Sequence, residues 1–172
     1  MQWQHQGYTI RPACAQDAND YFVALFDPLE EEVARFTGSA SVYPKEVVIP
    51  FFLRCVADET RHDFLILSPE GRIVGESVIN EYDPQTNTAN YRIAISGAQH
   101  RGRGIGTWAL RCACAFAFET LRLDALTLEV FEWNTRAVRV YQKCGFTLQG
   151  REEDALLLSL TRAQWETAQE HT

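Results

Sequence analysis

Short apolar runs alternate along this chain with clusters of Gly, Pro, Asn and Asp, which is the pattern of a sheet-forming protein. Runs of roughly four to nine residues, rich in Ile, Val, Leu, Tyr and Phe, predict strands. The predicted strands cover residues 8–11, 64–67, 73–81, 90–95, 126–131, 146–153 and 155–160. Turn sequences at 69–72 and 83–87 predict that three of these strands form antiparallel hairpins.

Longer segments between the strands predict helices, at about 16–26, 44–58, 104–121, 134–144 and 161–169. Residues 108–118 are apolar on nearly every helical face, which predicts a buried helix. Pro50 lies inside the second predicted helix and indicates a kink or a split there. Residues 27–43 contain an acidic run and several Ser, and we expect them to be irregular or only partly helical.

The order of these elements predicts an α/β (α+β) fold. The early hairpins need antiparallel pairing, whereas the later strand–helix–strand connections need parallel pairing, so the sheet must be mixed. We expect a mostly antiparallel central sheet of about six to seven strands, flanked by about four helices. The length of 172 residues predicts a single domain that covers residues 1–172.

Charge and cysteine content narrow the partners. The net charge of −7 argues against nucleic acid, because phosphate contacts need clustered Lys and Arg. No apolar run approaches the ~20 residues that span a bilayer, and no signal-peptide core is visible, so we expect no membrane contact and a cytoplasmic location. The five Cys are odd in number and include no Cys-x-x-Cys pair, which predicts neither a disulfide framework nor a metal site.

Residues 101–107, with the sequence RGRGIGT, form a glycine-rich loop between a predicted strand and the buried helix. Backbone N–H groups of such a loop and of the following helix N-terminus converge on one point, which favours a phosphate or pyrophosphate. Arg101 and Arg103 can add charge-assisted hydrogen bonds. The loop lacks the Gly-Lys-Ser/Thr of a Walker motif and the G-x-G-x-x-G spacing of a dinucleotide fold. A flexible turn with glycines for helix packing is the plainer alternative.

A second group of candidate residues follows the loop. Glu129 lies on the predicted strand 126–131, and Asn134, Ala137 and Tyr141 fall on one face of the helix after it. Taken alone, this helix has a structural interpretation, in which Asn134 caps it and Ala137 and Tyr141 pack in the core.

Together the two motifs resemble the GNAT-type acetyl-CoA-dependent N-acetyltransferases. The resemblance rests on R-x-x-G-x-G at 101–106, followed by N-x-x-A-x-x-x-Y-x-x-x-G-F at 134–146. An overlapping match of the first motif, at 99–104, is an alternative register. Within the family the chain is most similar to the branch of ribosomal-protein N-terminal and spermidine acetyltransferases.

The resemblance implies acetyl-CoA as co-substrate, with no metal. Backbone amides of the loop would hold the pyrophosphate, the end of the strand 90–95 would pair with the pantetheine arm, and an amide near Ile95 would polarise the thioester carbonyl. The implied acetyl-CoA-binding residues are Ile93, Ala94, Ile95, Arg101, Gly102, Arg103, Gly104, Ile105, Gly106, Thr107 and Asn134.

The resemblance also implies the catalytic groups. Tyr141 matches the general acid, and Glu129 matches a position that some members use as general base. The implied reaction is direct transfer of acetyl to a primary amine, which is a protein N-terminus, a polyamine or a small amine. The alternative is a non-catalytic acyl-CoA-binding sensor or partner module. Sheet edges of this fold favour a homodimer.

Several acidic side chains have two interpretations at this stage. Glu30, Glu31 and Glu32 lie where this fold often lines the acceptor mouth, so they either recognise a cationic amine or form a solvated charge run. Glu76 and Glu81 are either acceptor contacts or surface charges. His100, beside the glycine loop, contacts a phosphate or is a plain surface residue.

Overall fold

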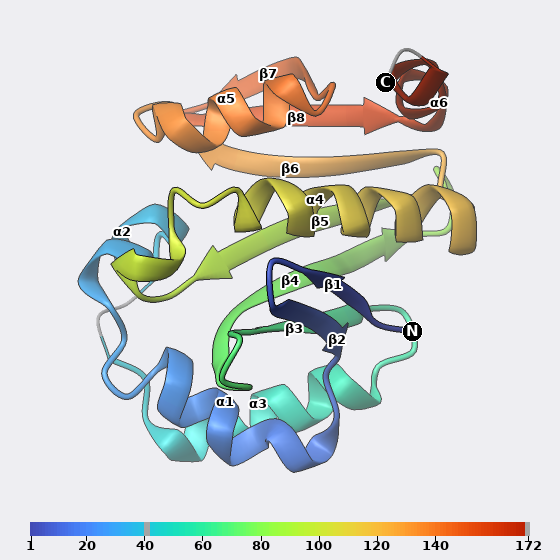
Figure 1. Cartoon of the computed structure of the whole chain (residues 1–172). Coiled ribbons are helices and arrows are strands. Elements are labelled where there is room, and N and C mark those ends of the chain that lie inside the picture. The colour runs from blue at the N-terminus through green and yellow to red at the C-terminus, as the bar shows by residue number, and fades with distance from the viewer. Residues whose placement is uncertain (40–41, 171–172) are drawn as a thin grey trace. The chain divides into compact units, whose positions relative to one another are not determined.

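Eight strands form one sheet in the computed structural model, which describes residues 1–39 and 42–170 of the chain (Figure 1). Their order is β1-β2-β3-β4-β5-β6-β8-β7. The strands are β1 (Trp3–His5), β2 (Tyr8–Pro12), β3 (His62–Leu67), β4 (Ile73–Asp83), β5 (Thr88–Ile95), β6 (Ala125–Phe131), β7 (Thr147–Glu152) and β8 (Ala155–Thr161). β5 and β6 run parallel, and the pairs β1-β2, β2-β3, β6-β8 and β7-β8 are antiparallel. The predicted mixed, mostly antiparallel sheet is confirmed.

The sheet has eight strands and not the six to seven expected, because β1 was not foreseen. β1 has only three residues, Trp3–His5, and pairs with β2 across a two-residue turn at Gln6 and Gly7. A strand of three residues is too short for an alternating apolar pattern to stand out. Its packing contact comes from Trp3, whose ring meets Phe64 edge-on at 5.3 Å between centroids.

Six α-helices lie in the part of the chain that the structure describes, where about four were expected. They are α1 (Ala18–Leu25), α2 (Glu31–Thr37), α3 (Lys45–Ala57), α4 (Ile105–Ala115), α5 (Thr135–Lys143) and α6 (Arg162–Glu170). Short helical turns precede α1 at Ala15–Asp17 and precede the glycine loop at Ala98–His100, and a wide π turn follows α4 at Phe116–Thr120.

α2 lies in the segment expected to be irregular or only partly helical, of which residues 40 and 41 are outside the described ones. Glu31 and Glu32 occupy the first turn and Arg35 the last. Acidic residues at the start and a basic residue at the end complement the helix dipole. The acidic run expected to be solvated therefore also stabilises a short helix.

α3 continues through Pro50, so of the two predicted outcomes, a kink or a split, the split is wrong. The proline removes one backbone N–H, which would otherwise bond to the carbonyl of Glu46. Val48, Phe52 and Cys55 are buried on one side of the helix, and this packing holds it together across the missing bond.

One compact unit of the structure comprises Met1–Val78 and Ile93–Ala109. In it α1 packs beside α3 (Figure 1). The core between these elements is aromatic and aliphatic, and the Tyr21 and Phe52 rings stack at 4.4 Å. The buried residues of this core are Ala18, Tyr21, Phe22, Leu25, Val48, Phe52 and Leu65.

The other compact unit comprises Ile79–Arg92 and the chain from Leu110 onward. β6 lies between β5 and β8, and alternate residues of β6 and β8 face a fully buried core. The predicted single domain over residues 1–172 includes residues 171 and 172, outside the described ones, and stays a prediction.

Candidate active site

The glycine loop has a backbone shape that only glycines reach without strain. Gly102 and Gly104 have φ angles of 76° and 82°. The carbonyl of Gly104 accepts the N–H of Trp108 at 2.9 Å, so the loop turns directly into α4. A Cβ placed on Gly104 would meet no atom within 4 Å, so open space lies over this backbone. Exposed amides at a helix start suit a phosphate-bearing group.

The end of β5 lies against both β4 and the loop. The Ser96 N–H donates to the Val74 carbonyl at 2.8 Å. Gly75 approaches so closely that a Cβ there would lie 2.5 Å from the Ala94 carbonyl oxygen and 3.3 Å from Ile95. On the loop side, a Cβ on Gly106 would lie 3.6 Å from Ile95 Cδ1. The structure therefore brings Ile95 and the loop together, as the sequence analysis expected.

The side chain of Arg101 points back toward the chain that precedes the loop. It forms ion pairs with Glu30 and with Glu32, the latter at 2.6 Å. It also donates to the Ile95 carbonyl at 3.3 Å. Two of the three acidic residues at 30–32 thus form ion pairs with Arg101, with Glu30 partly buried and the Glu32 side chain 53% exposed. The sequence had left these residues open between amine recognition and a solvated charge run.

Glu30 has three donors and a lowered pKa. The Gly97 N–H donates to it at 2.7 Å and the Ser96 hydroxyl at 3.2 Å, in addition to Arg101. Partial burial acts to raise this pKa, but the Gly97 hydrogen bond and the Arg101 charge together outweigh it. Glu30 is therefore ionised at any pH near neutrality.

Tyr8 contacts both His100, which precedes the loop, and Arg103 within it. The Tyr8 hydroxyl and His100 Nδ1 are joined by a 2.8 Å hydrogen bond. The Arg103 guanidinium carbon lies 6.0 Å from the centre of the Tyr8 ring, and Arg103 is exposed. His5 lies beside Trp108, with ring centroids 5.4 Å apart. Of the two interpretations of His100, the structure shows a residue held by Tyr8 rather than a plain surface residue.

Tyr141 lies on α5 and is almost fully buried, at 8% exposure. Its ring meets Phe146 edge-on at 5.8 Å. Burial raises the pKa of its phenol to about 12, and a smaller contribution comes from Cys144. No residue in the described part of the chain hydrogen-bonds to its hydroxyl, and that oxygen is not sealed from solvent.

Glu129 and Asn134, the other candidate site residues after α4, have different surroundings. Glu129 lies on the exposed face of β6, paired in register with Leu157 of β8. Asn134 caps α5, and its side-chain oxygen accepts the Ala137 N–H at 3.3 Å. The capping role expected from the sequence is thus present. Within the described residues, no hydrogen bond links Glu129 to Tyr141.

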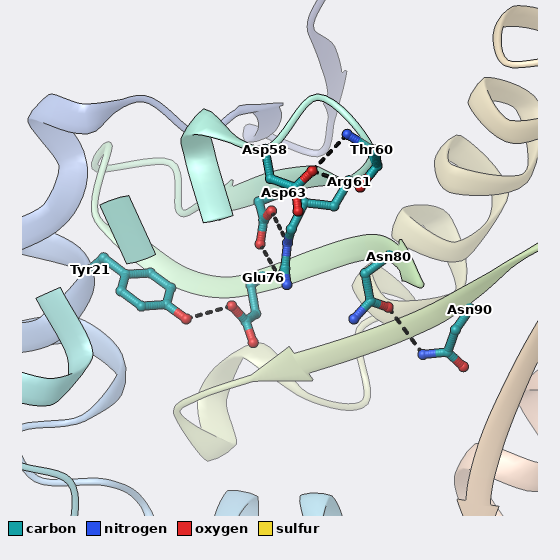
Figure 2. Close-up of polar contacts among 8 residues, drawn as sticks. All are labelled: Tyr21, Asp58, Thr60, Arg61, Asp63, Glu76, Asn80 and Asn90. Carbon is teal, nitrogen blue, oxygen red and sulfur yellow. Dashed lines mark hydrogen bonds and ion pairs between the residues drawn. The ribbon is translucent and has the colours of Figure 1, made fainter. Parts of the chain in front are cut away.

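A buried carboxylate on β4 was underestimated from the sequence. Glu76 is 7% exposed and accepts the Tyr21 hydroxyl at 2.7 Å (Figure 2). The interpretation as a surface charge is therefore wrong for Glu76. Its position within the apolar run 73–79 was the available signal, since a charge in the middle of a buried strand needs a partner. Asn90 donates to Asn80 at 3.1 Å in the same figure.

Cysteine reactivity and metal-ligand clusters were the other chemistry to consider among the described residues. All five Cys are free, and burial raises the pKa of Cys112 to about 11 and that of Cys144 above its usual range. Such thiols are poor nucleophiles near neutral pH. Across residues 1–39 and 42–170, no three His, Cys, Asp or Glu side chains group as metal ligands. Within the same residues, no helix has the length and apolar character needed to span a membrane.

A sequence model of the acetyltransferase (GNAT) domain matches residues 8–147, which is most of the chain. The chain belongs to the GNAT acetyltransferase family. The resemblance inferred from residues 101–106 and 134–146 is therefore confirmed, and the chain is an acetyl-CoA-dependent acyltransferase.

Curated relatives are similar at low identity. An uncharacterised prophage-derived N-acetyltransferase of Bacillus subtilis, YokL, is 20% identical over 95% of both chains. The spermidine N(1)-acetyltransferase of Escherichia coli K12 is 26% identical over 70% of this chain and 59% of its own length. The matched part therefore spans little more than half of that relative. An L-amino acid N-acetyltransferase of the same strain is 24% identical over 70% of this chain and 78% of its own.

Solved structures with the same fold include two from Vibrio species. The spermidine N-acetyltransferase of Vibrio cholerae, in complex with CoA and spermine, gives a TM-score of 0.79 at 17% identity, covering 94% of this chain and 99% of that one. The ribosomal-protein-S5-alanine acetyltransferase of Vibrio fischeri gives 0.79 at 15% identity, covering 96% and 98%. At these identities the comparison shows the shared fold alone.

Proposed function

We propose that this GNAT protein transfers an acetyl group from acetyl-CoA to a primary amine by direct attack within a ternary complex. The acceptor is a protein N-terminus, a polyamine or a small amine. Relatives named for spermidine and for L-amino acids support an amine acceptor, and they differ too much among themselves to select one.

The observation that carries this proposal is the shape of the glycine loop. Positive φ angles at Gly102 and Gly104, and the open space over Gly104, leave the backbone amides free to surround a pyrophosphate. In this proposal the amides of 102–106 hold the pyrophosphate, and Thr107 lies at the start of α4. Residues 93–95 pair with the pantetheine arm, and we assign Asn134 to contact that arm in addition to capping its helix.

The acetyl-CoA supplies an activated acyl thioester, so the protein has to position it and to manage two protons. An alkylamine has a pKa near 10.4, and only about one molecule in two thousand is neutral at pH 7. We assign Glu129 to accept the proton of the attacking amine, directly or through water. We assign Tyr141 to protonate the departing CoA thiolate, whose pKa resembles that of Cys.

Calorimetric titration with CoA tests the part of this proposal that places the CoA pyrophosphate at the glycine loop. We expect micromolar binding by the wild-type protein and weaker binding by Gly104→Ala, because an alanine at this φ must shift the loop. Equal affinity of the two proteins would show that CoA binds elsewhere.

Self-association is also part of the proposal, because sheet-edge strands such as β7 offer unpaired backbone groups. A neighbour in fold, the spermidine N-acetyltransferase of Vibrio cholerae, has a dodecameric structure. We expect a homodimer or a larger assembly of identical chains, and light scattering during size-exclusion chromatography measures its mass.

A further inference from the structure

The two arginines of the glycine loop have different surroundings. The Arg101 side chain is 15% exposed and is held by acidic residues, whereas Arg103 is exposed and has no ion-pair partner in the described part of the chain. The Arg103 guanidinium carbon lies over the face of the Tyr8 ring, 6.0 Å from its centroid. Within this loop, Arg101 is therefore largely buried and paired with acidic residues, whereas Arg103 is exposed.

The net charge around Arg101 differs from that around Arg103. Arg101 contributes one positive charge, and Glu30 and Glu32 together contribute two negative charges within ion-pair distance of it. The group as a whole is negative, so it offers no net attraction to a pyrophosphate. Arg103 is not compensated in this way, and its charge remains available to an anion.

Hydrogen bonds show what the internal group does instead. Glu30 accepts the Gly97 N–H at 2.7 Å and the Ser96 hydroxyl at 3.2 Å, and it also receives Arg101. Arg101 in turn donates to the Ile95 carbonyl at 3.3 Å. Glu30 and Arg101 thus hold the segment between Ile95, the last residue of β5, and Arg101, the first residue of the loop, at both of its ends. Glu30 itself precedes α2, so a residue far away in sequence fixes the loop.

We propose that Glu30 and Arg101 are positioning residues that hold the pyrophosphate loop against the end of β5, and that Arg103 is the arginine whose side chain contacts the phosphates of acetyl-CoA. The inference rests on the proposed binding of CoA at this loop. It assigns to Arg101 an internal role and gives the acidic residue Glu30 a function other than amine recognition.

The test is the salt dependence of CoA affinity, measured by calorimetry for Arg103→Ala, Arg101→Ala, Glu30→Gln and the double variant Glu30→Gln with Arg101→Ala. Arg54→Ala is the matched control, because Arg54 is exposed on α3 and lies outside the loop. Losing a charge-assisted phosphate contact weakens binding by roughly 10- to 100-fold at low salt, and the Arg103→Ala affinity then changes less with added salt than the wild-type affinity does.

The positioning residues should behave differently. Arg101→Ala and Glu30→Gln should each raise the KM for acetyl-CoA by about 5- to 20-fold with little change in kcat. The double variant leaves the net charge of the group unchanged and should keep the wild-type dependence on salt. The KM of the double variant should not exceed that of the more impaired single variant, because both substitutions remove the same set of contacts between the loop and the end of β5. Thermal unfolding of every variant confirms that each one is folded.

Two results would overturn the inference while the proposed function stands. One is a loss of salt dependence in Arg101→Ala with none in Arg103→Ala. The other is a double variant whose loss equals the product of the two single losses. A wild-type protein that does not bind CoA would remove both the inference and the proposed function. If Arg101→Ala does not fold, Arg101→Lys keeps the charge but not the two-sided contact, and the same comparison applies to it.

Discussion

The phenol of Tyr141 lies in an environment that fixes its protonation state. Burial raises its pKa to about 12, so the hydroxyl carries its proton at every pH at which an acetyltransferase works. A phenol that keeps its proton has one to donate and cannot serve as the base, and its raised pKa makes it a weaker acid than an ordinary tyrosine. The same burial places Tyr141 against Phe146, which fixes the ring orientation.

Replacing Tyr141 with Phe should lower kcat by about 10²- to 10³-fold, because a general acid contributes about that much. CoA affinity should stay within about twofold, because the ring still packs. Stopped-flow or thiol-release kinetics give kcat, and calorimetry gives the affinity. Unchanged turnover would show that Tyr141 is not the acid.

The pH profile gives an independent check of the same assignment. Activity should rise with pH as the amine loses its proton and should not fall before about pH 11, since Tyr141 remains protonated below its pKa of about 12. A descending limb near pH 9 that disappears in Tyr141→Phe would contradict a raised pKa.

Asp17 shows how a second residue contributes to stability. Arg11 binds it in a two-sided ion pair at 2.7 and 2.8 Å, and the Cys14 N–H donates to it at 2.9 Å. The Arg11 hydrogen bonds lower the pKa of Asp17 to about 2 against the opposing effect of burial. Because the folded-state pKa lies below the ordinary value, the stabilisation is present above about pH 4 and is lost as the pH falls toward 2.

Asp17→Asn should therefore lower the free energy of unfolding by about 2 kcal/mol at pH 7 and by much less near pH 2. Urea unfolding at several pH values measures both. Asp20→Asn is the matched control, since Asp20 is exposed on α1 and should cost less than about 1 kcal/mol at either pH. A loss for Asp17→Asn that does not change with pH would show that the ion pair is not its cause.

At the scale of elements, β4 and β5 are fitted together at Gly75. An alanine there would place its Cβ 2.5 Å from the Ala94 carbonyl oxygen, so one strand must move. We expect Gly75→Ala to cost about 1–3 kcal/mol of stability and to raise the KM for acetyl-CoA, because the end of β5 shifts with it. Gly150→Ala on β7 is the control, since its Cβ would make an ordinary 3.5 Å contact with Leu157. Equal stability and KM in the two variants would contradict this role of Gly75.

The loop itself gives a graded prediction. Gly104 has a φ of 82°, so Gly104→Ala is strained by about 1–2 kcal/mol and should weaken acetyl-CoA binding about tenfold. Gly106→Ala places a Cβ in ordinary contact, 3.6 Å from Ile95 Cδ1, and should change the affinity less than threefold. Measured affinities in the reverse order would show that the loop does not bind in this conformation.

Most elements could be read from the sequence because their apolar runs are long and their ends carry turn residues. β4, β5, β6 and α5 all lie close to the predicted ranges. β1 and α2 could not, since three residues carry no period and a run of acids is typical of exposed loops as well as of helix starts. Pro50 does not split α3, because side-chain packing, which no local sequence pattern reports, keeps the helix continuous.

At the scale of the whole molecule, the sequence located the candidate site but not its internal contacts. The glycine loop, Ile95 and Tyr141 follow from short motifs with fixed spacing. The partners of Glu30 come from the segment after β5 and from the loop, and Glu76 has a partner on α1. These residues are tens of positions away in the chain, and no single-sequence pattern reports such pairs.

The net charge of −7 also acts on the whole molecule. It repels the anionic acetyl-CoA and attracts a cationic amine, so local positive charge at the loop has to overcome an unfavourable overall field. This is the physical reason why one uncompensated arginine, Arg103, should matter so much.

The measurement that tests the central claim most directly is release of free CoA thiol from acetyl-CoA against a panel of amines. The panel contains polyamines, amino acids, aminoglycosides and peptides with free N-termini, with a reaction lacking acceptor as control. We predict turnover with at least one class, none without acceptor, and a loss of about 10²-fold or more in Tyr141→Phe. Tight binding of acetyl-CoA without turnover on any amine, or equal turnover by Tyr141→Phe, would contradict the account.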